Sequence, residues 1–338
     1  MCREWLVDLT DIKSEQNLLQ FWNFTDSWLE DRLGIDSNDT YALKDCDRNH
    51  YMFQDFKSYS SPPSRKYLQS VHLSTLAQRP ERLIQLGTLF GSSRLHLRNA
   101  QNTLVRKHVR QNMAFTNPYL LRTATTIRDA LGGLYLGAHI RLGDGLFQEN
   151  ARANVRLTWW KLLHFALKFS KADTLALEQR LFSHDVSAEF SSPPHIALDI
   201  PALRVPHPTL DPLPGSATPS LACPGALHTE VHLLPLNTPL FISTDALYPR
   251  SDPLLARFRQ TFPCTFFLAD FSAHTRALDA LLNGIDGVTL APFLLPFLDA
   301  MVVGRAWEVV GTEGSTFSAF VQDVLWRTYH GWDIVQRG

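Results

Sequence analysis

Residues 135–145 have the sequence YLGAHIRLGDG, a short apolar run that ends in a polar turn. A continuous apolar run of this length is typical of a strand that is buried on both faces, most often in a parallel sheet. Ligands of open α/β sheets bind outside the carboxyl ends of such strands. Because His139, Arg141 and Asp144 lie together at that end, the stretch predicts an anion-binding site.

The segments around this strand alternate between helix and strand patterns. A helix is predicted from Asn117-Pro118, a cap followed by proline, to the stop signal at Gly132-Gly133. Further strands are predicted at 239–243, 264–268 and 307–311. Further helices are predicted from a cap at Thr158, at 274–282, from Pro296 to Val303 and from Ser315 onward. This alternation predicts an α/β protein with a doubly wound parallel sheet.

The length of 338 residues predicts about two domains. We expect a first domain over residues 1–131 and a second over 132–338. Ten of the twenty prolines lie between Ser191 and Pro235, and the segments Pro193-Pro194 and 212–216 cannot be regular helix or central strand. We therefore expect an irregular insertion at about 184–235 within the second domain.

The composition argues against several classes of partner. The net charge is −1, from 32 basic and 33 acidic residues, so the chain has neither the basic excess of a nucleic-acid-binding protein nor a polybasic membrane patch. No run approaches the ~18–20 apolar residues of a transmembrane helix. The first residues lack the apolar core of a signal peptide. We expect a soluble chain that holds any anionic ligand by local groups.

The four cysteines are Cys2, Cys46, Cys223 and Cys264. None forms a C-x-x-C pair, so a structural zinc site is not expected. Their wide spacing fits either buried free thiols or one or two long-range disulfides. Sequons for N-glycosylation occur at Asn23 and Asn38, which would permit glycosylation in a secretory lumen but also arise by chance.

Arg141 is the strongest candidate for chemistry. Its guanidinium is always charged and can bind a phosphate with two parallel hydrogen bonds. The alternative is a structural arginine that bonds Asp144 or a backbone carbonyl. His139 lies two residues earlier and therefore points to the same face of the strand. It could bond a phosphate or a nucleoside, or be a satisfied core histidine. We expect Asp144 to orient Arg141 or to shape the turn.

The Ser315-Thr316 pair at a predicted helix start can present hydroxyl and N–H groups to a phosphate, or it can serve as an ordinary cap. Gly311 and Gly314 would allow a ligand to approach closely. Asp245, at the end of another predicted strand, could accept hydrogen bonds from guanine or ribose, or cap the next helix.

Asp299 is a polar residue inside a predicted apolar helix. Two roles are open for it: contact with a nucleobase, or a buried ion pair with Arg305. Asp45 and Asp47 form a D-x-D pair, which could hold a divalent metal on a diphosphate or be a solvated turn.

Three motifs in order resemble those of the GDP-fucose protein O-fucosyltransferase superfamily. Residues 139–144 (HIRLGD) resemble its H-x-R-x-x-D motif, residues 243–246 (STDA) its central strand end, and residues 311–318 (GTEGSTFS) its C-terminal S-T-F-S motif. Residues 87–94 and 326–332 resemble fungal members in particular. The resemblance covers roughly residues 80–338.

This resemblance implies a GT-B-like fold of two Rossmann-like domains, with the N-terminal one incomplete here. It implies an inverting, metal-independent transfer of fucose from GDP-fucose to a protein or glycan hydroxyl, without a cofactor, in the lumen of the ER or Golgi. By motif match, Arg141 would hold the β-phosphate. His139, Ser315, Thr316 and Phe317 would complete the GDP site, with Asp245 and Asp299 as further donor contacts.

We find neither the membrane anchor nor the Gly-rich N-terminal motif of the family in this sequence. In the family, the Gly-rich motif contributes to the active site. A GDP-sugar-binding relative without catalytic activity, or a truncated gene product, is therefore the alternative. A third hypothesis is a metal-dependent glycosyltransferase that uses Asp45 and Asp47.

Overall fold

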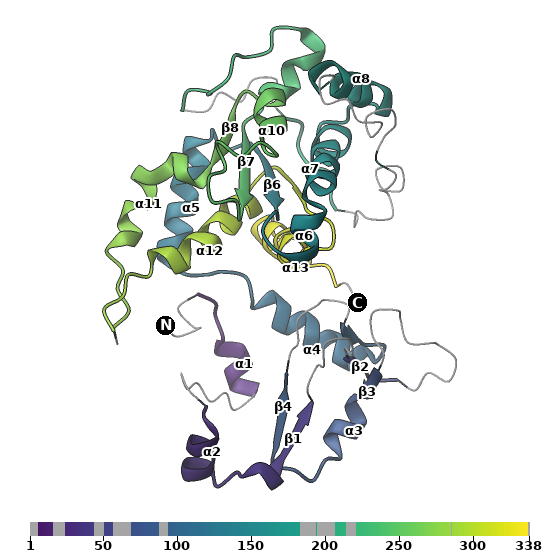
Figure 1. Ribbon diagram of the computed structural model, residues 1–338, viewed down its shortest axis with the longest axis vertical. Coiled ribbons are helices and arrows are strands. Elements are labelled where there is room, and N and C mark those ends of the chain that lie inside the picture. The colour runs from purple at the N-terminus through teal and green to yellow at the C-terminus, as the bar shows by residue number, and fades with distance from the viewer. Residues whose placement is uncertain are drawn as a thin grey trace. The chain divides into compact units, whose positions relative to one another are not determined.

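The computed structural model describes residues 6–15, 24–43, 51–56, 69–87, 94–182, 194, 207–213, 221–284 and 286–336. They form two compact units, which Figure 1 shows as ribbons. The larger unit contains residues 6–8 and 114–335, and the smaller contains 9–113 together with Gln336. The division after Met113 corrects the boundary expected after Leu131, because helix α5 (Pro118–Ala130) packs against α12 (Ala291–Gly304) of the larger unit.

The larger unit is built on a four-stranded, all-parallel sheet. Its strands lie in the order β8 (Thr265–Phe267), β7 (Leu240–Thr244), β6 (Leu136–Ile140) and β9 (Glu308–Gly311). In this register, His139 pairs with Ser243 on β7 and with Gly311 on β9. The predicted strands and their parallel arrangement are therefore confirmed, and the carboxyl ends of β6, β7 and β9 meet at one edge.

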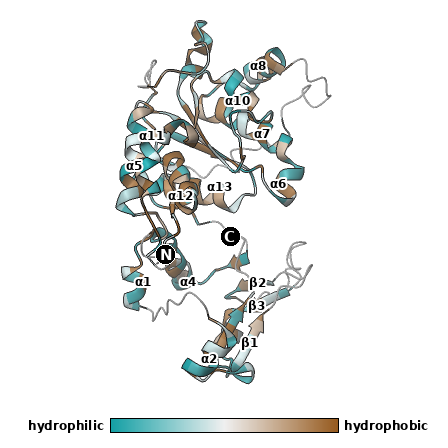
Figure 2. Ribbon diagram, turned by 60° about the vertical axis from the view of Figure 1, so that its left-hand side comes forward, coloured by the Kyte–Doolittle hydropathy of each residue, from teal (hydrophilic) through white to brown (hydrophobic). Residues whose placement is uncertain are grey.

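Helices cover both faces of this sheet. One face packs against α7 (Ala151–Trp160), the π-helical segment η4 (Lys161–Ala166), α8 (Lys171–Phe182), η7 (Val231–Asn237) and α10 (Ala256–Thr261). The other face packs against α5, α11 (Ser272–Asp279), α12 and the π-helical segment η9 (Val321–Trp326). Figure 2 shows that α12 is mostly hydrophobic, as its burial requires. The larger unit is thus the doubly wound α/β layer that the sequence predicts.

Short elements connect these layers. They are α6 (Gly145–Glu149), η8 (Leu268–Phe271), α13 (Thr316–Phe320) and α14 (Arg327–Tyr329). Helix α13 runs directly into η9 and then into α14, so the helix predicted from Ser315 onward is present with a π-helical middle.

Helix α5 follows its sequence signals closely. The Asn117 side chain accepts hydrogen bonds from the backbone N–H groups of Tyr119 and Leu120, as an N-cap does. Gly132 and Gly133 have φ angles of 87° and 81°, which end the helix. The predicted apolar stripe is fully buried and consists of Leu120, Ala124, Ile127 and Leu131.

Two predicted helix starts are wrong. Thr158 lies inside α7, and its hydroxyl donates to the backbone oxygen of Asn154 at 2.8 Å instead of capping a helix. Pro296 lies inside α12, which begins five residues earlier at Ala291. In both helices the burial of an apolar face continues across the local signal, so tertiary packing overrides it.

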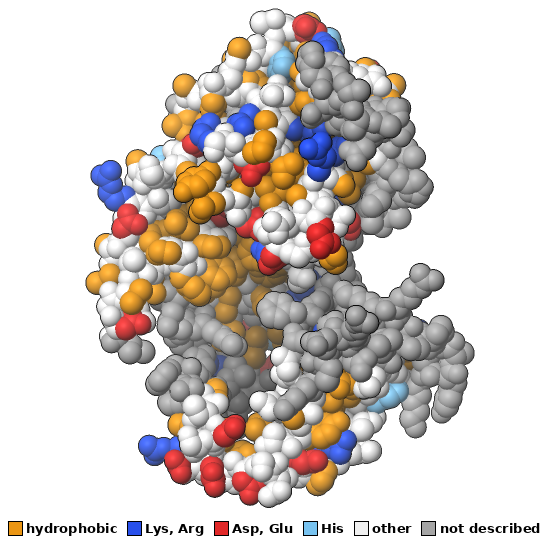
Figure 3. Space-filling view, in the orientation of Figure 1, with side chains coloured by type: hydrophobic (Ala, Val, Ile, Leu, Met, Phe, Trp, Pro, Cys, Tyr) orange, Lys and Arg blue, Asp and Glu red, His pale blue; other side chains and the backbone are white. Residues whose placement is uncertain are grey.

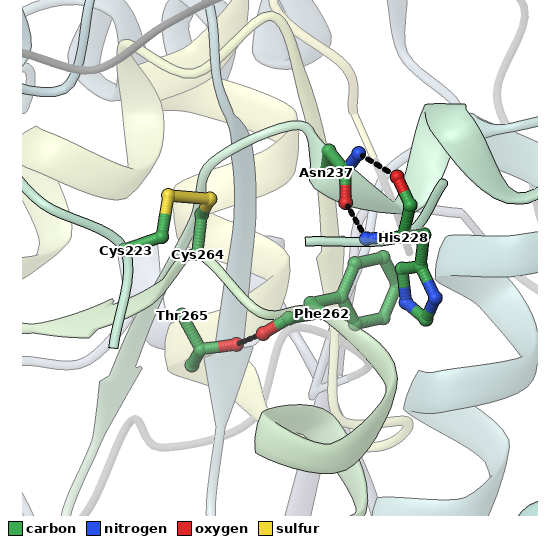
Figure 4. The surroundings of a disulfide bond; sticks show 6 residues. All are labelled: Cys223, His228, Asn237, Phe262, Cys264 and Thr265. Atoms are coloured by element: carbon green, nitrogen blue, oxygen red, sulfur yellow. Dashed lines mark hydrogen bonds between the residues drawn. A yellow bond between two sulfur atoms is a disulfide. The ribbon is translucent and has the colours of Figure 1, made fainter. Parts of the chain in front are cut away.

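The described part of the proline-rich insertion is tied to the sheet by a disulfide. Cys223 and Cys264 are bonded, with their Cα atoms 4.4 Å apart (Figure 4). A backbone hydrogen bond of 2.9 Å from Gly225 to Pro263 lies beside it. The disulfide alternative is therefore confirmed for this pair, while Cys2 and Cys46 lie outside the described residues.

The smaller unit also contains parallel strands. Strands β1 (Thr40–Leu43) and β4 (Leu83–Leu86) form one pair, and β3 (Gln69–His72), β2 (Tyr51–Gln54) and β5 (Leu95–His96) form a three-stranded sheet. Its helices are α1 (Thr10–Glu15), α2 (Asp26–Leu33), the short 3-10 helix η2 (Ser37–Asp39), α3 (Leu73–Ala77) and α4 (Ala100–Gln111). Across the described residues of both units, none of the helices combines the length and apolar character needed to span a bilayer.

Candidate functional site

Arg141 lies where strand β6 ends, at the edge where the carboxyl ends of β6, β7 and β9 meet. Its Nε atom is 3.1 Å from Oδ2 of Asp245, and its Nη2 atom is 2.9 Å from Oδ2 of Asp144. The side chain keeps 35% of its surface exposed, and no residue in the described part of the chain bonds Nη1. Arg141 is thus oriented by two carboxylates, and one of its donor groups remains available to a ligand.

Asp245 organises the turn that follows β6. Its carboxylate accepts from the backbone N–H of Leu142 at 2.7 Å and from that of Gly143 at 3.0 Å, in addition to its ion pair with Arg141. A side chain at Gly143 would overlap this carboxylate, so the turn requires glycine there. Asp245 does not cap the next helix, because α10 begins only at Ala256, and that alternative is wrong.

His139 is buried on the face that carries α12 and α13. Its Nδ1 lies 2.7 Å from the hydroxyl of Ser318, and its ring centre lies 5.0 Å from that of Phe317. Burial lowers the pKa of His139 to about 4, against an opposing contribution from nearby Asp245, so the imidazole is neutral at pH 7. No described residue bonds its Nε2.

Gly311 makes room for the helix that carries Ser318. A Cβ at this position would lie 2.7 Å from Cβ of Ser318 and 2.9 Å from Oε1 of Gln322. The space expected for a ligand beside Gly311 is therefore filled by side chains of α13 and η9. Gly314 differs, because its φ is +73° and no described residue lies within 4 Å of where its Cβ would be.

Ser315 caps helix α13. Its hydroxyl oxygen accepts from the backbone N–H of Ser318 at 3.2 Å, which is the ordinary N-cap that the sequence left as an alternative. Thr316 is exposed in the first turn, and Phe317 is half-buried against His139. These residues therefore lie around the same carboxyl edge as Arg141, on the turn that follows β9.

Asp299, from α12, lies beneath this edge. It is 8% exposed and bonds the Ser243 hydroxyl and the backbone of Thr244, and burial raises the pKa of its carboxyl to about 7. Its Oδ1 atom is buried and has no hydrogen-bond partner in the described part of the chain. The alternative of an ion pair with Arg305 is wrong, since Arg305 donates to Thr125 and lies 4.8 Å from the ring centre of Tyr329.

Lys161 belongs to this edge but was not among the residues expected from the sequence. Its Nζ donates to the carbonyl oxygen of Gly311 at 3.1 Å and to Oε2 of Glu313 at 2.9 Å. The signal that could have identified it is a lysine inside the apolar run of residues 159–166, WWKLLHFA. A charge in such a run requires a buried partner.

The described residues give no support to a metal centre. Within them, no group of three His, Cys, Asp or Glu side chains is arranged to hold a metal ion. Asp45 and Asp47, on which the metal-dependent hypothesis rests, lie outside the described residues. Figure 3 shows basic and acidic side chains interspersed on one face of the molecule.

The fold and site define an α/β protein with a parallel sheet and an ion-paired arginine at its carboxyl edge. Comparisons with models of protein families, with curated proteins and with solved structures found no match for this chain.

Proposed function

We propose that this protein binds the diphosphate of a nucleotide sugar at the carboxyl edge of the larger sheet. The supporting observation is Arg141, which is fixed at the end of a buried parallel strand, paired with two carboxylates and still one-third exposed. The sequence motifs narrow the proposal to an inverting, metal-independent fucosyltransferase of GT-B-like organisation. It would transfer fucose from GDP-fucose to a hydroxyl of a protein or glycan.

In this proposal Arg141 acts on the leaving group. Negative charge grows on the β-phosphate as the bond to the sugar breaks, so a fixed guanidinium there stabilises the transition state more than the ground state. The loss of one such preorganised donor typically costs about 2.7–4 kcal/mol of activation free energy. His139, neutral and buried, would offer Nε2 as a hydrogen-bonding group on the same face of β6.

The charges around Arg141 determine how a phosphate could enter. One guanidinium faces two carboxylates, so the site has a surplus of negative charge before a ligand arrives. The Asp144 side chain is 75% exposed, and exposed ion pairs contribute only about 0.2–1 kcal/mol. Asp245 is held by two backbone N–H groups as well. A phosphate would therefore replace Asp144, and Asp245 would stay in place.

The disulfide supports the compartment that belongs to this proposal. Disulfides persist in oxidising compartments such as the ER lumen and are rare in reducing ones. The bond between Cys223 and Cys264 therefore favours an oxidising compartment, of which the ER or Golgi lumen is one.

The alternative is a GDP-sugar-binding relative that does not catalyse transfer. One observation favours it: at the described edge of the sheet, both carboxylates next to Arg141 are ion-paired with it, so neither serves as an unpaired general base. Donor binding and catalysis therefore need separate experiments.

Calorimetry with GDP and GDP-fucose tests the donor site. We expect the wild-type protein to bind both, and Arg141→Ala to bind GDP at least about tenfold more weakly, a loss of about 1.4 kcal/mol. Arg152→Ala, on the exposed surface of α7, serves as the matched control. Equal GDP affinity in wild type and Arg141→Ala would overturn the role of Arg141.

Two further measurements separate the alternatives. Release of GDP from GDP-fucose in the presence of a mixed panel of acceptor peptides and glycans would favour the enzyme. Tight GDP binding without any turnover would favour the non-catalytic relative. Loss of GDP binding on adding a chelator would instead favour the metal-dependent hypothesis.

A further inference from the structure

The first residue of the π-helical segment η4 is a buried lysine. The Lys161 side chain is only 9% exposed, and a buried ammonium is unfavourable unless it is paired and hydrogen-bonded. Its two partners in the described chain are the carbonyl oxygen of Gly311 and the carboxylate of Glu313. π-Helical segments occur frequently at functional sites, so the turn that Lys161 bonds is a candidate part of the site.

The two partners of Lys161 lie on either side of Thr312. The backbone N–H of Thr312 donates to the carbonyl oxygen of His139 at 3.1 Å. Its hydroxyl oxygen accepts from the backbone N–H of Arg141 at 3.0 Å. Thr312 is 3% exposed, so this connection is shielded from water. Lys161 thus fixes Gly311 and Glu313, the neighbours of Thr312, and Thr312 holds the backbone of Arg141.

Lys161 reaches this turn from the opposite side of the sheet to the His139 ring. Its neighbours Leu162 and Leu163 belong to the core layer formed with α7 and α8, whereas Phe317, which packs against His139, belongs to the other layer. The carboxyl edge is therefore held from both faces: Ser318 bonds His139 of β6 on one side, and Lys161 bonds Gly311 of β9 on the other.

We propose that Lys161 is a positioning residue of the anion site, which holds the turn 311–313 and, through Thr312, the backbone at Arg141. This inference rests on the proposed function of the edge as a nucleotide-diphosphate site. Lys161 touches neither the ligand nor the reacting atoms. Its removal should therefore weaken the contacts that Arg141 makes with phosphate.

A lysine that merely stabilises the packing of η4 on β9 would behave differently. Its loss would lower thermal stability and would weaken all ligands of the site alike. If Lys161 is a positioning residue, its loss weakens binding of the diphosphate and leaves binding of the nucleoside unchanged, because Arg141 is proposed to bind phosphate. It also makes the effects of Lys161 and Arg141 non-additive, since both act through one contact.

The test compares GDP with guanosine by calorimetry. We expect Lys161→Met to weaken GDP binding about tenfold, which corresponds to about 1.4 kcal/mol of binding free energy. The affinity for guanosine should stay unchanged. The double variant Lys161→Met/Arg141→Ala should bind GDP no more weakly than Arg141→Ala alone. Lys171→Met, an exposed lysine of α8, is the matched control and should bind both ligands like the wild type.

A milder variant keeps the test valid if Lys161→Met does not fold. Glu313→Gln retains Lys161 and removes the charge of one of its two partners. We expect this variant to weaken GDP binding by less than tenfold and to leave the affinity for guanosine unchanged. Unchanged GDP affinity in a folded Lys161→Met or, failing that, in Glu313→Gln overturns the inference, as do equal losses for both ligands. A wild-type protein that binds guanosine and GDP equally, or neither, overturns the proposed function itself.

Discussion

The Nε atom of Arg141 lies 3.1 Å from Oδ2 of Asp245, and this ion pair joins the turn after β6 to the turn after β7. The same carboxylate also accepts from the backbone N–H groups of Leu142 and Gly143. One side chain therefore sets both the path of the backbone and the direction of the guanidinium. This arrangement gives the Arg141 site its geometry before any ligand binds.

Asp245→Asn should destabilise the protein and loosen Arg141. The amide retains one acceptor oxygen, but its NH₂ group faces donors, so one backbone N–H loses its partner together with the ion pair. We expect a loss of about 1–3 kcal/mol in the free energy of unfolding, measured with urea. Asp286→Asn, an exposed aspartate with one such bond to Val288, is the control and should lose less. Equal losses in the two variants would contradict this role.

Asp144→Asn should strengthen GDP binding. The Asp144 carboxylate is exposed and occupies Nη2 of Arg141, so a phosphate that bonds both Nη1 and Nη2 must displace it. Removing its charge should raise GDP affinity by a factor of about two to five, corresponding to an exposed ion pair of about 0.5–1 kcal/mol. Calorimetry at low and moderate salt measures this, and the gain should shrink as salt screens the pair. Weaker binding would contradict this prediction, because it would mean that the orientation Asp144 gives Arg141 outweighs the charge it presents to the phosphate.

Two buried groups near this edge should make stability depend on pH in opposite directions. Burial lowers the pKa of His139 to about 4, while the unfolded value is about 6.5. Between these values the unfolded chain binds a proton that the folded chain does not. The contribution of His139 to the free energy of unfolding is therefore full above pH 6.5. It falls as the pH drops towards 4, by about 3 kcal/mol in all.

Asp299 makes the stability depend on pH in the opposite direction to His139. Burial raises the pKa of its carboxyl to about 7, from an ordinary value of 3.8, so the folded protein keeps a proton that the unfolded chain has released. This contribution is full below about pH 4 and is lost as the pH rises through 7. In the wild-type protein the two contributions should largely offset each other between pH 4 and 6.5.

Single variants should separate these contributions. Relative to wild type, Asp299→Asn should gain stability as the pH rises from 4 to 7, because its amide does not ionise. His139→Gln should gain relative stability as the pH falls from 6.5 to 4. Urea denaturation at several pH values measures both trends. Curves that run parallel to the wild-type curve would contradict the burial-driven shifts.

Much of the larger unit follows from local sequence, and the rest depends on distant contacts. The apolar runs of β6, β7 and β9 and the caps of α5 were predictable because each signal lies within its own element. The roles of Asp245 and Lys161 were not, since their partners lie 103 and 150 residues away. The helix starts expected at Thr158 and Pro296 failed because apolar faces continue across them.

Removal of the disulfide should lower stability by about 4 kcal/mol. Cys223 and Cys264 are 41 residues apart, and a cross-link over that distance restricts the unfolded chain by about this amount in the loop-entropy treatment. We expect Cys223→Ala/Cys264→Ala to unfold at lower urea concentration than the wild type. A reducing agent should lower the wild-type midpoint to that of the variant and leave the variant unchanged. If reduction shifts both proteins equally, the stabilisation does not come from this bond.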